Sequence, residues 1–125
     1  MRIKYGDSSL ILAGDVETKA QELMVEHFGD CLSSTILKAP HHGRNSGYYS
    51  EFVKKVKPDY TIVSTGKKDN DATDKYRYHT NKKVFSTRFQ GTIYAELYLD
   101  GDVKIYNSPK KGSERIDAGA SESDA

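Results

Sequence analysis

The sequence lacks most of the features that mark specialised classes of protein. Its single cysteine, Cys31, excludes an internal disulfide and a cysteine-rich metal site. It has no apolar stretch near the roughly 20 residues that a bilayer-spanning helix needs, and no signal-peptide core at its N-terminus. These absences predict a chain without a membrane segment, with the cytoplasm as its default compartment.

The sequence also has no excess of charge of either sign. Lysine and arginine (19) balance aspartate and glutamate (18), for a formal net charge of +1. The total charge therefore gives no electrostatic reason to expect a nucleic acid, a membrane surface or an acidic partner, although a local patch would depend on the fold. A length of 125 residues with 36% hydrophobic residues fits one small globular domain.

The first half of the chain predicts two strands, a helix and a third strand. "RIKY" and "SLILAG" are strands joined by a turn, and the second of them is continuously apolar, as a strand covered on both faces should be. "TILKA", ended by Pro40, is the next strand. Between them an amphipathic helix ends at Gly29. Its apolar residues fall at helical spacing: Val16, Ala20, Leu23, Met24 and Phe28.

The second half predicts a short helix, two strands and a hairpin. "YYSEFVKKVKP" is a helix ended by Pro58, "DYTIVSTG" is a buried strand, and residues 66–81 form a long polar loop. "KVFSTRF" is an edge strand, and the alternating "GTIYAELYLDGDVKIYN" is a hairpin that turns at Asp100 and Gly101. Residues 108–125 have almost no bulky apolar side chains and are predicted to be a disordered tail. Residues 1–107 then form one α/β domain with a mixed sheet, two helices and a C-terminal β-hairpin.

Candidate reactive side chains follow the predicted strands. Asp15 comes after "LILAG", His41 and His42 come after "TILKAP", and His79 lies in the long loop after "YTIVSTG". Reactive groups in layered α/β folds collect where strands end, because the backbone there is rigid yet exposed. Carboxylate and imidazole together suit a divalent ion such as zinc, manganese or iron, which can activate water for attack on phosphorus or carbonyl carbon.

Each candidate also has a purely structural interpretation. Asp15 opens a helix and could be its N-cap, a role compatible with metal binding. Adjacent loop histidines are often solvent-exposed or hydrogen-bonded, and His79 could be a simple loop residue. His27, near a helix end, is explained by the helix dipole and is given no function.

The order of these segments resembles one protein family. "LAGDVE", an amphipathic helix, "ILKAPHHG", "FVKKVKPDYTIVSTG", a histidine-containing loop and "STRFQGTI" follow one another as in the C-terminal half of metallo-β-lactamase-fold hydrolases. The likeness is to the hydrolase domain of ComEC-type DNA-uptake proteins, and it runs from about Ile3 to Tyr106. "GD" or "HHG" alone is a weak signal, but the two at this spacing before "VKPDY" form a specific one.

The resemblance implies a fold, a site and a reaction. The fold is half of an αββα sandwich with a dinuclear metal site at the edge between its sheets. Asp15 is then the metal-bridging aspartate and His42 a ligand to the second ion, because related "GHG" motifs place the ligand immediately before the glycine. His41 supports that ligand or faces the substrate, and His79 corresponds to a histidine of a "GHP" loop near the substrate. Relatives include phosphodiesterases and nucleases, which use a metal-activated water.

Three departures from the family pattern bear on function. No histidine precedes His27, so the N-terminal "HxHxDH" or "HxDxDH" motif, which supplies most ligands of the first metal, is absent. Arg44 replaces the serine that usually follows "HHG", and Tyr78 and Thr80 replace the glycine and proline of the "GHP" loop.

Two hypotheses follow from these departures. The chain is part of a phosphodiester hydrolase completed by an N-terminal half, or it is a catalytically incompetent half-domain that serves as a binding or structural module. A half-sandwich should expose an apolar sheet face of several hundred Å², so we expect self-association or a requirement for the other half.

Overall fold

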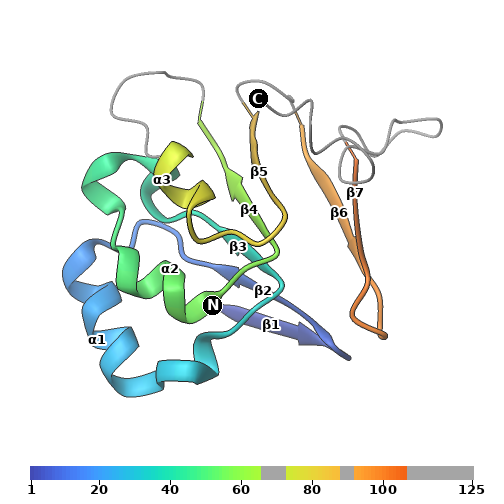
Figure 1. Cartoon of the computed structure of the whole chain (residues 1–125), viewed down its shortest axis with the longest axis horizontal. Coiled ribbons are helices and arrows are strands. Elements are labelled where there is room, and N and C mark those ends of the chain that lie inside the picture. The colour runs from blue at the N-terminus through green and yellow to red at the C-terminus, as the bar shows by residue number, and fades with distance from the viewer. Residues whose placement is uncertain (66–72, 88–91, 107–125) are drawn as a thin grey trace.

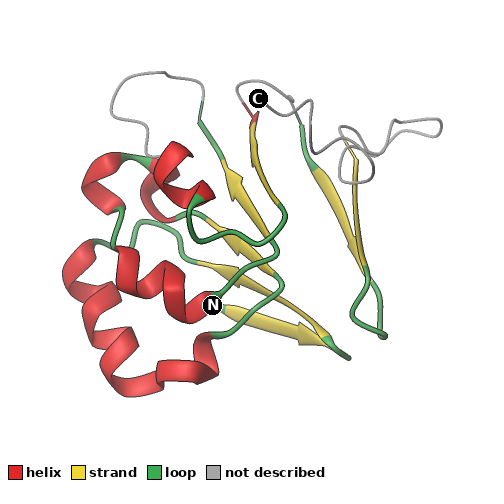
Figure 2. Cartoon of the chain, viewed as in Figure 1, coloured by secondary structure: helices red, strands yellow, loops and turns green. Residues whose placement is uncertain are grey.

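The chain folds around a five-stranded sheet with helices on one side and a β-hairpin on the other (Figures 1 and 2). The computed structural model describes residues 1–65, 73–87 and 92–106. The elements of these residues, in chain order, are β1 (Arg2–Tyr5), β2 (Ser8–Leu12), α1 (Thr18–Phe28), β3 (Ile36–Lys38), α2 (Ser50–Val56), β4 (Tyr60–Val63), α3 (Thr73–Arg77), β5 (Lys83–Ser86), β6 (Tyr94–Leu97) and β7 (Val103–Tyr106). Three short 3-10 turns lie at Gly29–Leu32, Pro40–Gly43 and Asn45–Gly47.

The sheet is mixed, as the sequence predicted. Its strands lie in the order β1-β2-β3-β4-β5, with β1 antiparallel to β2 and the other pairs parallel. The parallel pairing brings the carboxyl ends of β2, β3 and β4 to one edge of the sheet. The predicted edge strand is confirmed, since β5 closes the sheet on the side opposite β1.

The helices cover one face of the sheet through the larger of two apolar cores. Successive strand side chains point to opposite faces, so Leu37 and Val63 face the helices while their neighbours Ile36 and Ile62 face away. The helical contribution centres on α2, whose Phe52 is fully buried. Gly29, the predicted end of α1, caps that helix with a positive φ of 47°.

The hairpin covers the other face of the sheet through the second core. Val103 and Ile105 of β7 pack with residues of β3, β4 and β5, including Ile36 and Phe85. The Ser8 hydroxyl, at the start of β2, donates to the carbonyl oxygen of Tyr98, the residue after β6, at 2.6 Å. The predicted C-terminal hairpin is therefore confirmed, and it adds a third layer to the sheet and its helices (Figure 1).

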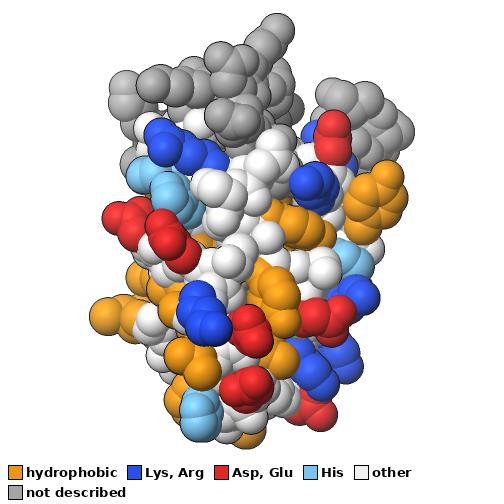
Figure 3. All heavy atoms as spheres, turned by 90° about the vertical axis from the view of Figure 1, so that its left-hand side faces the viewer, with side chains coloured by type: hydrophobic (Ala, Val, Ile, Leu, Met, Phe, Trp, Pro, Cys, Tyr) orange, Lys and Arg blue, Asp and Glu red, His pale blue; other side chains and the backbone are white. Residues whose placement is uncertain are grey.

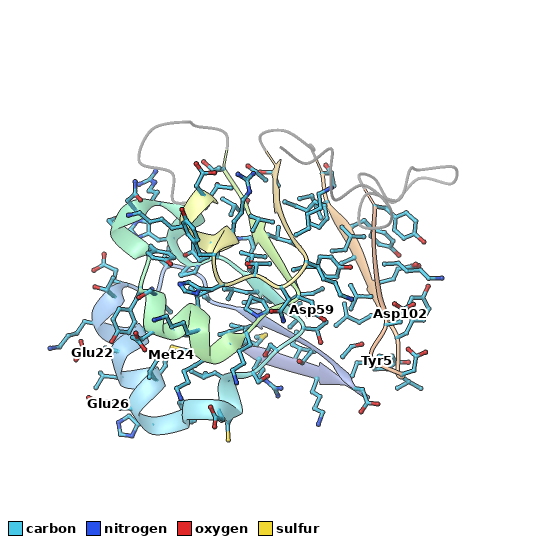
Figure 4. The ribbon with its side chains drawn as sticks, viewed as in Figure 1. Tyr5, Glu22, Met24, Glu26, Asp59 and Asp102 are labelled. Atoms are coloured by element: carbon cyan, nitrogen blue, oxygen red, sulfur yellow. The ribbon has the colours of Figure 1, made fainter. Side chains whose placement is uncertain are left out.

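The apolar side of α1 is less buried than its spacing suggests. Leu23 is 48% exposed and Phe28 is 58% exposed, whereas Gln21 is fully buried. Figure 4 shows Met24 between α1 and α2, with Glu22 and Glu26 on the outward side. The helical face of the molecule consequently shows hydrophobic side chains lying between charged ones (Figure 3).

The predicted loop at residues 66–81 contains a helix, which corrects the expected number of helices from two to three. Within α3, Tyr76 is fully buried and packs edge-on against Tyr48, with ring centroids 5.0 Å apart. Arg77 and Asp74 form an ion pair on its exposed side. One buried aromatic side chain thus fixes a short helix that has too few apolar residues to show a periodic pattern.

Two other predictions concern the C-terminal tail and membrane-spanning helices. The tail at residues 108–125 lies outside the described residues, so the domain boundary at residue 107 stays a prediction. No helix in the described part of the chain is long and apolar enough to span a membrane.

Candidate metal centre

Asp15 lies in an exposed turn directly after β2. We call Gly14 and Asp15 the aspartate turn; Gly14 adopts a left-handed conformation with φ of 60°. The alternative role of Asp15 as a helix N-cap is wrong, because α1 begins at Thr18 and Glu17 occupies the N-cap position without a side-chain bond. The Asp15 carboxylate is exposed and is therefore open to an incoming ligand.

The two histidines lie in a turn with an unusual backbone. In this histidine turn (Pro40–Gly43), His41, His42 and Gly43 all have positive φ, at 52°, 55° and 73°. A left-handed conformation costs a residue other than glycine about 1–3 kcal/mol, so the surrounding contacts must impose it. The Arg44 amide donates to the His41 carbonyl oxygen at 3.1 Å and closes the turn.

The side chain of His42 is held in one orientation. Its Nδ1 atom lies 3.0 Å from the carbonyl oxygen of Ser64, the residue that follows β4. A carbonyl oxygen can only accept a hydrogen bond, so Nδ1 must carry the proton in this contact. The neutral ring then has its lone pair on Nε2, which is the arrangement of a metal-binding histidine held by a backbone carbonyl.

The side chain of His41 lies deeper in the turn than that of His42. Its ring is partly buried, and its Nδ1 atom is buried without a hydrogen-bond partner among the described residues. Gly47 packs against it so closely that a Cβ on Gly47 would lie 2.6 Å from the His41 Cβ. His41 is therefore positioned by packing, whereas His42 is positioned by a hydrogen bond.

The aspartate turn and the histidine turn are joined directly. The His41 amide donates to the Gly14 carbonyl oxygen at 2.7 Å. This bond links the residue before Asp15 to the residue before His42, at the carboxyl ends of the neighbouring parallel strands β2 and β3. The structure therefore brings two of the predicted site residues, Asp15 and His42, onto adjoining turns, with His41 between them.

His79 lies toward the other end of β4. The Asn81 amide donates to the Pro58 carbonyl oxygen at 2.8 Å, and the Thr80 hydroxyl lies 2.7 Å from that of Thr61. The residues directly after His79 therefore lie beside the start of β4. His42 contacts Ser64, beyond the end of the same strand. The structure does not bring His79 beside the two turns, and its catalytic role stays a prediction.

The described residues supply part of a metal-binding donor set. Asp15 offers an exposed carboxylate and His42 an imidazole with a free Nε2, a combination that zinc, manganese and iron all accept. Within residues 1–65, 73–87 and 92–106, no group of three or more histidine, cysteine or acidic residues is placed to hold a metal ion. A carboxylate and an imidazole are suitable ligands for such a metal, but a metal site needs more than these two ligands.

Two contributors to this site escaped prediction from the sequence. The Ser64 carbonyl orients His42, but a backbone carbonyl has no sequence signature. Gln21 is fully buried on α1, and its side-chain amide donates to the carbonyl oxygens of Val16, which follows the aspartate turn, and of Gly47, which lies beyond the histidine turn. Its only signal was a polar residue within an apolar helical pattern, which is too common to single out.

Comparison with known proteins finds partial similarity to three longer proteins. It is 35% identical over 66 residues to Competence protein ComA of Neisseria gonorrhoeae, covering 53% of this chain and 10% of that protein. It is 31% identical over 77 residues to ComE operon protein 3 of Bacillus subtilis, covering 62% and 9%. A third relative, the uncharacterized protein YcaI of Escherichia coli, is 24% identical over 105 residues, covering 84% and 13%.

These relatives are much longer than the region they share with the chain. The chain spans about a tenth of the length of the curated relatives it matches. No protein-family model matches it.

Proposed function

We propose that this chain is part of a metal-dependent hydrolase of the metallo-β-lactamase superfamily that acts on phosphodiester bonds of a nucleic acid or nucleotide. The observation that carries the proposal is the bond between the aspartate turn and the histidine turn, His41 N to Gly14 O at 2.7 Å. It joins the turns that carry a carboxylate and an oriented imidazole, at the carboxyl ends of parallel strands, where α/β proteins commonly bind ligands.

Asp15 and His42 would hold the metal, with zinc as the proposed ion and manganese or iron as alternatives. A divalent ion at such a site supplies Lewis acidity and lowers the pKa of bound water. Asp15 would contribute a carboxylate from an exposed turn, and His42 would contribute the Nε2 atom of an imidazole oriented by the Ser64 carbonyl. The left-handed backbone of the histidine turn is consistent with this role, because backbone strain concentrates at functional sites.

His41 and Arg44 are proposed to act on the substrate rather than on the metal. His41 lies in the histidine turn next to the aspartate turn, with its ring partly buried, and would hold or transfer a proton at the substrate. Arg44 follows the histidine turn, is exposed, and takes the place of a serine in the resembled family. A guanidinium there suits an anionic phosphodiester better than a neutral carbonyl substrate.

The partial donor set makes a second structural unit part of the proposal. The missing ligands would come from an N-terminal half that carries an "HxHxDH"-type motif, either on the same longer polypeptide or on another chain. The relatives named for competence support a nucleic acid as the substrate, since competence is the uptake of DNA.

The second candidate function is a binding or structural module without catalysis. The observation in its favour is that the described residues hold no group of three or more metal ligands. In this alternative Asp15 and the histidines stabilise two surface turns and bind no ion.

The two candidates are separated by hydrolysis of bis(p-nitrophenyl) phosphate in the presence of zinc or manganese. The protein assayed carries whatever coding sequence lies upstream of Met1 in the gene. We expect hydrolysis to fall by about 100-fold or more in Asp15→Ala and in His42→Ala, because each removes a proposed ligand. His27→Ala, which changes an exposed histidine on α1, is the matched control and should retain activity. Equal activity in all four proteins would refute the proposed site, and neither hydrolysis nor bound metal in the wild type would favour the binding module.

A further inference from the structure

Gln21 is a fully buried polar side chain that hydrogen-bonds to Val16, directly after the aspartate turn, and to Gly47, four residues after the histidine turn. We propose that Gln21 is a positioning residue that sets the separation and orientation of the aspartate turn and the histidine turn. The reason for positioning the two turns rests on the proposed function, whereas the contacts of Gln21 involve no metal.

The side-chain amide of Gln21 bridges two segments far apart in the sequence. Its Nε2 donates to the carbonyl oxygen of Val16 at 3.1 Å and to that of Gly47 at 2.7 Å. Val16 directly follows Asp15, and its own amide donates to the Ala13 carbonyl oxygen at 3.3 Å. One nitrogen with two hydrogens therefore holds the residue after the aspartate turn on one side and Gly47 on the other.

Gly47 transmits this contact to the histidine turn. Its amide donates to the Arg44 carbonyl oxygen at 3.0 Å, which ties it to the residue that closes that turn. There is no space between Gly47 and His41, because a Cβ on Gly47 would meet the His41 Cβ at 2.6 Å. A shift of the Gly47 backbone toward His41 must therefore displace His41.

Two independent links consequently join the two turns. The first is the main-chain bond from the His41 amide to the Gly14 carbonyl oxygen, and the second is the Gln21 bridge from Val16 to Gly47. The pairing of β2 with β3 anchors the start of each turn, and the two links hold the parts of the turns that lie beyond the strands. The bridge needs a donor of two hydrogens, which excludes glutamate at this position because an ionised carboxylate only accepts.

The test compares Gln21→Met, which keeps the length of the side chain and removes its donors, with Ile105→Ala. Ile105 is fully buried in the hairpin core on the opposite face of the sheet, so its truncation lowers stability without touching either turn. Two NMR readouts at about pH 8, above the ordinary pKa of histidine, report the geometry without metal. They are the hydrogen-exchange rate of the His41 amide and the ¹⁵N shifts that report the tautomer of His42.

We expect Gln21→Met to speed exchange of the His41 amide by about tenfold relative to Ile105→Ala, because the bond to Gly14 is no longer supported by the bridge. We also expect the His42 ring to change from one tautomer to a mixture. Equal exchange rates and a single tautomer in both variants would overturn the proposal. Gln21→Asn, whose amide is one methylene short of the bridge, gives the same comparison if Gln21→Met does not fold.

A zinc titration of the same proteins separates this inference from the proposed function. Zinc-induced shifts at Asp15 and His42 should need a higher zinc concentration in Gln21→Met than in Ile105→Ala. A wild-type chain that shows no such shifts contradicts the metal site, while the exchange rate and the tautomer still decide the role of Gln21. Equal zinc dependence in the two variants contradicts the positioning role and leaves the metal site standing.

Discussion

Replacement of Gly43 by alanine should destabilise the protein far more than the same change at Gly14. Both glycines have left-handed backbones, with φ of 73° and 60°. They differ in their surroundings: a Cβ on Gly43 would lie 2.4 Å from the Val63 Cγ1 atom, whereas a Cβ on Gly14 would have no atom within 4 Å. Val63 is fully buried beneath the helices and cannot move aside freely.

The magnitude follows from two separate costs. A left-handed conformation costs an alanine about 1–2 kcal/mol, which applies at both positions. Forcing an extra carbon into a packed core adds about 1–3 kcal/mol, which applies only beside Val63. Gly14→Ala should therefore lower the free energy of unfolding by about 1–2 kcal/mol and Gly43→Ala by about 2–5 kcal/mol.

Urea unfolding monitored by circular dichroism measures this difference, and a double-mutant cycle identifies its cause. Val63→Ala removes both Cγ atoms, so Gly43→Ala should cost at least about 1 kcal/mol less in that background than in the wild type. Equal costs for Gly14→Ala and Gly43→Ala, or strict additivity with Val63→Ala, would refute the account of how Val63 fixes the histidine turn.

Two further predictions concern Tyr76 and the face of β1 and β2. Burial raises the pKa of the Tyr76 hydroxyl in the folded protein. Above about pH 10 this hydroxyl therefore ionises in the unfolded chain before it ionises in the folded one. The free energy of unfolding of the wild type should then fall by about 1.4 kcal/mol per pH unit relative to that of Tyr76→Phe. Urea unfolding at alkaline pH measures this difference, and parallel pH curves would contradict it. On β1 and β2, Ile3 and Leu12 are 44% and 39% exposed, so changing both to lysine should reduce self-association in sedimentation velocity. Leu23→Lys on α1 is the control, and a wild type that is already monomeric would count against the half-sandwich proposal.

The strands and the hairpin were predictable because their signals are local. The alternation in "TIYAELYL" and the Asp100-Gly101 turn predict β6 and β7 without reference to the rest of the chain, and the structure confirms them. The continuous apolar run of "LILA" predicts a strand covered on both faces, and β2 contributes Ile11 to one core and Leu10 to the other.

The third helix and the burial of α1 were not predictable because they depend on tertiary contacts. The few residues of α3 are fixed by Tyr76 packing on Tyr48, a contact between segments 28 positions apart in the sequence. Leu23 and Phe28 have the spacing of a buried helical stripe, yet the helix turns Gln21 inward to reach Val16 and Gly47. Buried hydrogen bonds of this kind leave no periodic pattern.

The candidate site was predictable in composition but not in geometry. The positions of Asp15 and His42 after strands, together with the family resemblance, identified two residues that the structure places on hydrogen-bonded turns. The strand ends alone also suggested His79, which the structure places toward the start of β4 rather than beside them. The sequence does not show whether a residue that follows a strand lies near the end of that strand or near its start.

The central claim is that Asp15 and His42 bind one metal ion, and an NMR titration of the chain with zinc tests it most directly. A two-ligand site binds weakly, and chemical shifts detect weak binding that a purified protein would lose on dialysis. We predict saturable shifts at the Asp15 carboxylate and the His42 Nε2 atom with the same apparent dissociation constant, and the loss of the His42 shift in Asp15→Ala. Shifts no larger than those of the exposed control His27, or shifts at His42 that persist in Asp15→Ala, would contradict it.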